Sequence, residues 1–290
     1  MPVPLVENAP AKVNLTLSVL RRRDDGYHEL ESLVVFADFG DRLSLSRGGE
    51  LKLLVGGPGA AQAGEGDDNL VLKAARAFAR HHSRAALGTF RLDKRLPVAA
   101  GLGGGSADAA AALRLIAQAN GLAGNDPDLY AAAKATGADV PVCLDPRPRI
   151  MRGVGEILSA PLALPKLPAV LVNPGVALPT KAVFARLTPV ANPEIASDIG
   201  AVAKFSNRDQ LLQFLGTQSN DLEPPAIAIQ PVIATVLTAL RGLPGCHLAR
   251  MSGSGATCFA LFSGVTAARE SARILRGKFP HWWVKATTLN

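Results

Sequence analysis

One segment of this chain, residues 97–113, constrains the fold more than any other because it places a dense run of glycine directly before an alanine-rich run. It reads P-V-A-A-G-L-G-G-G-S-A-D-A-A-A-A-L. The residues just before it, 89–92, alternate in the way of a short strand. The order of strand, glycine loop and helix start therefore predicts a mixed fold of helices and strands around this loop.

A loop of this composition is suited to phosphate. Glycine allows backbone N–H groups to approach a ligand without interference from a Cβ atom, and a helix N-terminus adds unpaired N–H donors and a partial positive charge. Ser106 is a candidate N-cap, and Asp108 in the first turn would complement the helix dipole. An ordinary glycine turn with a Ser-capped helix is the alternative, but four glycines within residues 101–105 favour phosphate binding.

The known phosphate loops differ from this one in identifiable ways. No lysine follows the last glycine, as a P-loop requires, and Ser106 stands where the dinucleotide fingerprint needs a third glycine. The protein-kinase motifs H-R-D and D-F-G are absent. The pattern P-x-x-x-G-L-G-G-G-S-[SA]-[ND]-A-A instead resembles the loop of the GHMP small-molecule kinases.

That resemblance implies an enzyme that uses ATP together with Mg²⁺. It assigns the ATP phosphates to the loop residues Pro97, Gly101, Leu102, Gly103, Gly104, Gly105 and Ser106. Asn69 and Leu70 match a family segment near the adenine.

Further motifs narrow the resemblance to one branch of the family. In chain order they are P-A-K-V-N (10–14), D-G-Y-H (25–28), D-D-N-L (67–70), G-A-D-V-P (137–141), G-V-G-E (153–156), S-N-D-L (219–222) and S-G-S-G-A (252–256). The set resembles the GHMP kinases that phosphorylate the 2-hydroxyl of diphosphocytidyl methylerythritol in the non-mevalonate route to isoprenoids. Residues 145–152 depart from that pattern because they are unusually rich in proline and arginine.

Lys12, Asn14 and Asp139 are the candidates for chemistry at the acceptor. The spacing of Lys12 and Asn14 places both on one face of a strand, and by itself this pattern predicts only a half-buried strand with a wet polar face. Asp139 by itself is typical of a turn or cap. The resemblance implies that Lys12 lies beside the acceptor hydroxyl, that Asn14 contacts substrate and that Asp139 is the general base, kept ionised by the lysine.

The resemblance also assigns the remaining substrate contacts. Tyr27, His28 and Phe184 would hold the cytosine ring, while local evidence shows only a turn at Asp25-Gly26 with two residues beside it. A second glycine loop, residues 252–255, is a turn on local evidence. In the family it borders the substrate phosphates, which assigns Gly253, Ser254 and Gly255 to substrate binding.

Composition restricts the class of protein and its partners. The 290 residues are 48% hydrophobic and 19% charged, which is typical of a globular protein. A formal charge of +7 without a basic stripe or interleaved aromatics argues against nucleic acid. A small phosphorylated substrate is enough to explain this charge, and an ordinary solvated basic surface explains it still more simply. Three cysteines are too few for a disulfide framework. No signal peptide or membrane-length apolar run is present, so we expect a cytoplasmic protein without membrane contact.

The chain should fold as an α+β protein. The resemblance implies a nucleotide-binding domain over residues 1–160 and a ferredoxin-like domain over 161–290. We expect strands at 11–20, 33–36, 42–46, 51–55, 89–92, 169–173, 247–251, 257–262 and 282–286, and helices at 70–81, from the glycine loop to 120, and at 127–136, 180–187, 208–216, 225–241 and 265–277.

Two other functions compete with this hypothesis. A GHMP kinase for homoserine or mevalonate would have no use for the D-G-Y-H segment. A non-catalytic nucleotide-binding regulator is disfavoured because Lys12 and Asp139 are both present. The motifs specify neither an oligomeric state nor a metal ligand.

Overall fold

The computed structural model describes the chain except for residues 1–2, 83–84, 188–198, 200–204 and 206. It forms two compact units, each built from separate segments of the chain. Unit 1 comprises Met1–Lys12, Gly40–Val98 and Gly103–Pro146, and unit 2 comprises Val13–Phe39, Ala99–Leu102 and Arg147–Asn290. Helices and strands mix throughout, which confirms the α+β class. The domain boundary at residue 160 stays a prediction.

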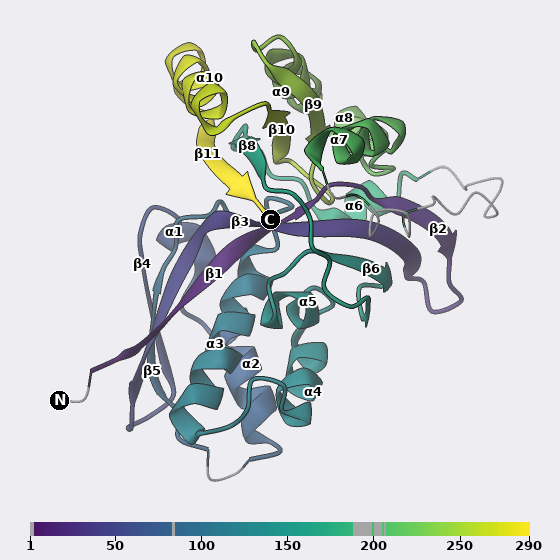
Figure 1. Ribbon diagram of the computed structural model, residues 1–290. Helices are drawn as coiled ribbons and strands as arrows, with labels where there is room; N and C mark the ends of the chain where they lie inside the picture. The colour runs from purple at the N-terminus through teal and green to yellow at the C-terminus, as the bar shows by residue number, and fades with distance from the viewer. Residues whose placement is uncertain (1–2, 83–84, 188–198, 200–204, 206) are drawn as a thin grey trace. The chain divides into compact units, whose positions relative to one another are not determined.

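Unit 1 is a small sheet with helices packed on it (Figure 1). Strand β4 (Lys52–Gly56) runs parallel to β5 (Gly88–Asp93), which pairs antiparallel with residues 42–47 of β3 (His28–Arg47). Strand β1 (Leu5–Asn14) also pairs with β3. The helices are α1 (Ala60–Ala63), α2 (Leu70–Ala79), α3 (Gly104–Asn120), α4 (Pro127–Thr136) and α5 (Val140–Leu144). Apolar side chains between helices and sheet, including Phe78, Phe90, Leu96 and Leu113, are fully buried and form its core.

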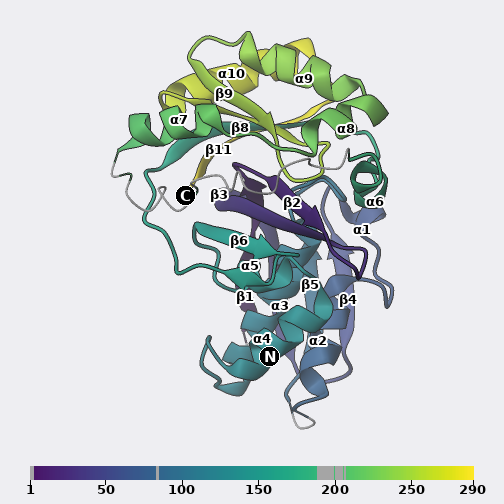
Figure 2. The same cartoon turned by 90° about the vertical axis from the view of Figure 1, so that its right-hand side faces the viewer.

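Unit 2 contains an antiparallel sheet in the order β11 (Trp283–Leu289), β8 (Leu167–Asn173), β10 (Cys258–Phe262) and β9 (Cys246–Met251). Helices α9 (Val232–Arg241) and α10 (Val265–Lys278) cover one face of it (Figure 2). The order β8-α9-β9-β10-α10-β11 is that of a ferredoxin-like unit, which confirms the expected fold. Residues of both layers form one cluster, including Val170, Leu237, Phe262 and Leu275.

Shorter elements complete unit 2. They are β2 (Ser18–Arg22), β6 (Arg149–Gly153), β7 (Ile157–Leu158), α6 (Thr180–Phe184), α7 (Arg208–Thr217) and α8 (Glu223–Ile229). Strands β2 and β6 pair with the first part of β3. The proline- and arginine-rich segment therefore contributes β6, where the Arg152 guanidinium donates to Glu31 of β3 at 2.7 Å. None of the helices in the described part of the chain is both long and apolar enough to cross a membrane.

Some predicted elements differ from those observed. The strands expected at 33–36 and 42–46 are one continuous β3. The strand expected at 11–20 is two strands, since β1 ends at Asn14 and β2 begins at Ser18. The single helix expected at 225–241 is α8 followed by α9, because Pro231 has no N–H for the helical ladder.

Candidate functional site

The glycine loop leads directly into α3, as predicted, but the helix starts differently. Its N-cap is Gly103, whose φ of +60° is left-handed, and no side chain caps the helix. The predicted N-cap Ser106 is wrong, because this left-handed turn starts the helix at Gly104 and places Ser106 inside the first turn. The first N–H groups of α3 are therefore left without a side-chain cap and point to where an anion could bind.

The residue beside this helix start is Lys12. A Cβ atom on Gly103 would lie 3.3 Å from both Cβ and Cε of Lys12. A Cβ atom on Gly105 would lie 3.3 Å from Leu70 Cδ1, so the start of α2 also adjoins the loop. Asn69 caps α2, since its Oδ1 accepts from Val71 N at 3.0 Å.

Lys12 and Asp139 form an ion pair within unit 1. Lys12 Nζ donates to Asp139 Oδ2 at 2.8 Å. The lysine side chain is 5% exposed and the aspartate side chain 34% exposed, so the carboxylate is the partner that faces solvent. Asp139 occupies the N-cap position of α5 but makes no capping hydrogen bond. The expectation of a wet polar strand face is wrong for Lys12 and Asn14, which are both buried.

Arg114 of α3 connects the two segments that carry this ion pair, and the sequence analysis missed it. Its guanidinium donates to the carbonyl oxygen of Cys143 at the end of α5 at 2.8 Å. It also donates to Asn8 O at 2.7 Å and to Glu7 Oε2 at 3.0 Å on β1. The only sequence signal was one arginine in an apolar helical stretch, which does not reveal its partners.

Asp108 does not act as the sequence predicted. It lies beyond the first turn of α3 and is buried, so it does not complement the helix dipole. Its Oδ2 accepts from Lys94 Nζ at 2.6 Å, and Lys94 also donates to Asp41 Oδ2 at 2.6 Å. A carboxyl group on the inward face of a helix needs a polar partner, and Lys94 supplies one.

In unit 2 the second glycine loop closes on the first. Ser252 Oγ donates to Gly101 O at 2.9 Å and accepts from Asn14 N at 3.1 Å. A Cβ atom on Gly101, which has φ +75°, would lie 2.4 Å from Ser252 O. Close backbone approach therefore requires glycine here. Ser254 Oγ lies 2.8 Å from Thr180 Oγ1 at the start of α6.

Asn14 carries an acceptor that the protein does not use in the described structure. Its Nδ2 donates to Ser32 Oγ at 2.7 Å, and its Oδ1 is buried with no hydrogen-bond partner among the described residues. A Cβ atom on Gly253 would lie 3.3 Å from this oxygen. Buried unpaired acceptors are rare in folded proteins, so this one marks a place for a ligand donor.

The predicted cytosine-binding residues meet in part. The rings of His28 and Phe184 lie 5.0 Å apart between centroids and are tilted by 30°. Tyr27 is 64% exposed and follows a turn in which Asp25 Oδ1 accepts from Tyr27 N. Burial, followed by the nearby Arg22 charge, lowers the pKa of His28 below its usual 6.5. A neutral imidazole offers both a donor and an acceptor.

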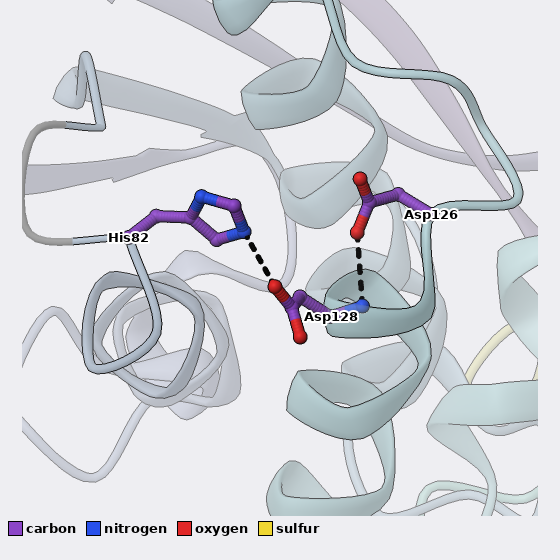
Figure 3. A group of neighbouring side chains, drawn as sticks. All are labelled: His82, Asp126 and Asp128. Carbon is purple, nitrogen blue, oxygen red and sulfur yellow. Dashed lines mark hydrogen bonds and ion pairs between the residues drawn. The ribbon is translucent and has the colours of Figure 1, made fainter.

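Two other features of the described residues resemble sites. His82, Asp126 and Asp128 gather at the start of α4 (Figure 3), where His82 Nε2 lies 2.8 Å from Asp128 Oδ2 and Asp126 Oδ1 accepts from Asp128 N. Asp126 serves here as the helix cap, a role that needs no metal. A cavity of about 550 Å³ in unit 2 contains no predicted site residue; it is lined by Gln218, Ser219, Asn220, Glu223, Pro224, Arg241, Cys246, His247, Leu248, Ala249 and Arg250.

Comparison with known proteins places this geometry in a family. The profile described as GHMP kinases N terminal domain matches residues 69–145, and the one described as GHMP kinases C terminal matches 191–281. Two proteins named 4-diphosphocytidyl-2-C-methyl-D-erythritol kinase, from Xanthobacter autotrophicus and Methylorubrum extorquens, are 56% and 54% identical to this chain. The first alignment covers 97% of each chain; the second covers 98% of this chain and 99% of its relative.

Solved structures agree. A crystal structure of 4-(cytidine 5'-diphospho)-2C-methyl-D-erythritol kinase matches with a TM-score of 0.79 and 36% identity over 99% of both chains. Homoserine kinase from Cytophaga hutchinsonii matches with a TM-score of 0.76 over 100% of this chain and 95% of its own, but with 19% identity, which shows the common fold alone. The chain is an ATP-dependent small-molecule kinase. It belongs to the 4-diphosphocytidyl-2-C-methyl-D-erythritol kinase family of GHMP kinases.

Proposed function

We propose that this enzyme transfers the γ-phosphate of ATP to the 2-hydroxyl of 4-diphosphocytidyl-2-C-methyl-D-erythritol, giving the 2-phosphate and ADP. The observation that carries the proposal is the Lys12–Asp139 ion pair at 2.8 Å, with Lys12 packed against the N-cap glycine of α3. A base, a cation and a phosphate-binding helix start are the parts that phosphoryl transfer to an alcohol requires. The names of the relatives at more than 50% identity support the choice of alcohol.

Each residue of the pair has one task in this mechanism. The partly exposed Asp139 carboxylate accepts the proton of the attacking hydroxyl as its oxygen forms a bond to the γ-phosphorus. The bond between that phosphorus and the bridging oxygen of ADP breaks in the same transfer. The Lys12 ammonium stabilises negative charge on the oxygens, and the uncapped N–H groups of α3 hold the ATP phosphates.

Mg²⁺ would reach the enzyme bound to ATP and would neutralise phosphate charge there. The Ser106 hydroxyl, in the first turn of α3, is an oxygen donor that would suit this ion beside the phosphates. The Asp108 carboxyl does not fit because it is buried and held by Lys94.

Residues of unit 2 would recognise the substrate. His28 would hydrogen-bond the edge of the cytosine, and Tyr27 and Phe184 would stack on its ring. The unpaired Oδ1 of Asn14 would accept from a substrate hydroxyl, while the loop containing Gly253, Ser254 and Gly255 would border the diphosphate. Cytoplasmic location and the absence of a nucleic-acid partner stay predictions from the sequence.

The test is a phosphorylation assay that offers ATP with diphosphocytidyl methylerythritol, homoserine or mevalonate in parallel. We expect ADP release with the cytidyl substrate alone, and a product whose new phosphate is at the 2-position by ³¹P NMR. Comparable kcat/KM for homoserine or mevalonate would reject the proposed substrate. ATP hydrolysis without transfer to any of the three would reject the proposed reaction.

A further inference from the structure

A buried cluster of three charged side chains lies in unit 1, apart from the Lys12–Asp139 pair. Lys94 Nζ donates to Asp41 Oδ2 and to Asp108 Oδ2, each at 2.6 Å. All three side chains are at most 4% exposed. Two carboxyl groups around one buried ammonium are costly to desolvate. Added stability therefore does not by itself explain why this cluster is present.

The cluster ties the segment before the glycine loop to the helix after it. Asp41 Oδ1 accepts from the backbone N–H groups of Arg95, at 2.5 Å, and Leu96, at 2.8 Å, just before the loop begins. Lys94 lies in the same segment, and Asp108 belongs to α3. The three side chains therefore fix both ends of the loop relative to β3, which carries Asp41.

The ammonium also lies directly beneath the helix start. A Cβ atom on Gly104, the first residue of α3, would lie 3.2 Å from Lys94 Nζ and 3.5 Å from Leu96 Cδ1. The first turn thus rests on the cluster. Burial raises the pKa of Asp108, against the opposing effect of the Lys94 charge. Lys94 is therefore the partner that offsets the cost of a carboxyl group beneath the helix start.

We propose that Lys94, Asp41 and Asp108 are positioning residues that hold the first turn of α3 in the conformation that binds the ATP phosphates. This inference rests on the proposed phosphate-binding role of the loop, and it places the effect of the cluster on nucleotide affinity. The transfer step, which the Lys12–Asp139 pair performs, depends on it only weakly.

The test is Lys94→Met in the full-length enzyme. Misplacing the helix start should raise both the KM for ATP and the Kd for ATP, measured by titration calorimetry without acceptor, by roughly 10–100-fold. At saturating ATP, kcat should remain within about threefold of wild type. This change is much smaller than the expected loss of ATP affinity. Asp108→Asn, which keeps an oxygen acceptor for Lys94, should bind ATP nearly as well as wild type, whereas Asp108→Leu should behave as Lys94→Met does.

Lys73→Met is the matched control, because Lys73 is an exposed lysine of α2 whose ion-pair partner in the described part of the chain is the exposed Asp68. Unchanged ATP affinity in a folded Lys94→Met variant would overturn the proposal, as would an equal loss in kcat with KM unchanged. If Lys94→Met does not fold, the triple variant Lys94→Met, Asp41→Asn, Asp108→Leu removes the charges together and should show the same loss of affinity. Calorimetry needs no acceptor, so a wild-type enzyme that binds ATP but phosphorylates none of the three alcohols would reject the proposed function and leave this test intact.

Discussion

Two aspartates of unit 1 each pair with a lysine, and their surroundings assign them different tasks. Asp139 is a third exposed beside Lys12, so a substrate hydroxyl can reach its carboxylate. Asp108 is buried beside Lys94 and out of reach of any substrate. Under the two proposals above, the same pair of residue types would serve chemistry in one place and the shape of a loop in the other.

Asp139→Asn keeps the size of the side chain and removes the base. We expect kcat to fall roughly 10²–10⁴-fold, the usual range for loss of a general base, with the Kd for ATP little changed. Lys12→Ala should also lower kcat. The loss in the double variant should be far smaller than the two single losses combined, because the two residues act as a unit. Asp68→Asn, at a fully exposed position, is the control. Near-wild-type turnover in Asp139→Asn would reject its role.

His28→Ala should change which base the enzyme prefers. A site that hydrogen-bonds a base edge discriminates against analogues that leave its polar groups unpaired, so the preference for the cytidyl substrate over a uridyl analogue should narrow. Because burial and the Arg22 charge lower the pKa of His28 below 6.5, its imidazole is mostly neutral at pH 7, and the preference should change little between pH 7 and 8. Unaltered base preference in His28→Ala would remove His28 from the site.

The stacking residues should behave differently from His28. Tyr27→Ala and Phe184→Ala should each weaken both substrates by about 1–3 kcal/mol, since stacking tolerates any base. Steady-state KM values for both substrates measure this. Tyr130→Ala, at an exposed tyrosine of α4 in unit 1, is the matched control. A selective loss of the cytidyl substrate in Tyr27→Ala would contradict the stacking role.

Helix α3 serves several parts of the proposed site through different turns. Its start adjoins Lys12 and rests on Lys94, and its middle carries Arg114, which reaches both β1 and the end of α5. One helix thus contacts both the proposed phosphate-binding loop and the segments that carry the Lys12–Asp139 pair. Changes at its start and at its middle should therefore have separable effects.

Gly103→Val should weaken ATP binding. The residue has φ +60°, which a β-branched side chain rarely adopts, and the new side chain would occupy space next to Lys12. Calorimetric titration with ATP measures the effect. Gly49→Val shares the positive φ but has nothing within 4 Å of the new Cβ, so it reports the strain alone. Equal ATP affinity in the two variants would refute the phosphate-binding role of the loop.

Arg114→Met should act on turnover. Without its guanidinium, the end of α5 and the strand that carries Lys12 lose their common donor, and we expect kcat to fall about tenfold or more from misalignment of the pair. The KM for ATP should stay within about threefold of wild type, because the segments that Arg114 holds do not belong to the glycine loop. Arg273→Met, on the exposed face of α10, is the control. A change in KM for ATP without a change in kcat would contradict this role.

Stability of the folded chain should depend on pH through Asp108. Its folded pKa of about 8 exceeds the ordinary value of 3.8, so between these limits the folded state holds a proton that the unfolded state has released. The free energy of unfolding therefore falls as pH rises through this window, and this group adds no further change above it. Asp108→Asn removes the effect. The free energy of unfolding of the variant, measured with urea, should therefore rise relative to that of wild type between pH 5 and pH 9. Parallel curves would contradict the buried protonated carboxyl.

Local patterns in the sequence predicted most elements and the proximity of Lys12 and Asp139. The glycine-rich helix start, the P-A-K-V-N strand and the G-A-D-V-P turn are contiguous motifs, so they could be read directly. The cluster of Asp41, Lys94 and Asp108 and the contacts of Arg114 could not, because their partners are far apart in the chain. The N-cap at Ser106 failed because a left-handed glycine, not a side chain, starts the helix.

The antiparallel pairing of β11 with β3 has a consequence for how the chain is made. Leu289 pairs with Ala37, and Asn290 exchanges backbone hydrogen bonds with Phe36. On the ribosome, residues 36 and 37 are complete long before the strand that pairs with them emerges from the exit tunnel. Long-range pairing of this kind slows folding and leaves strand edges open to wrong partners meanwhile. On the nascent chain, the part of β3 at residues 36 and 37 should therefore lack its β11 partner until residues 289 and 290 have left the exit tunnel, and chaperones could bind there meanwhile.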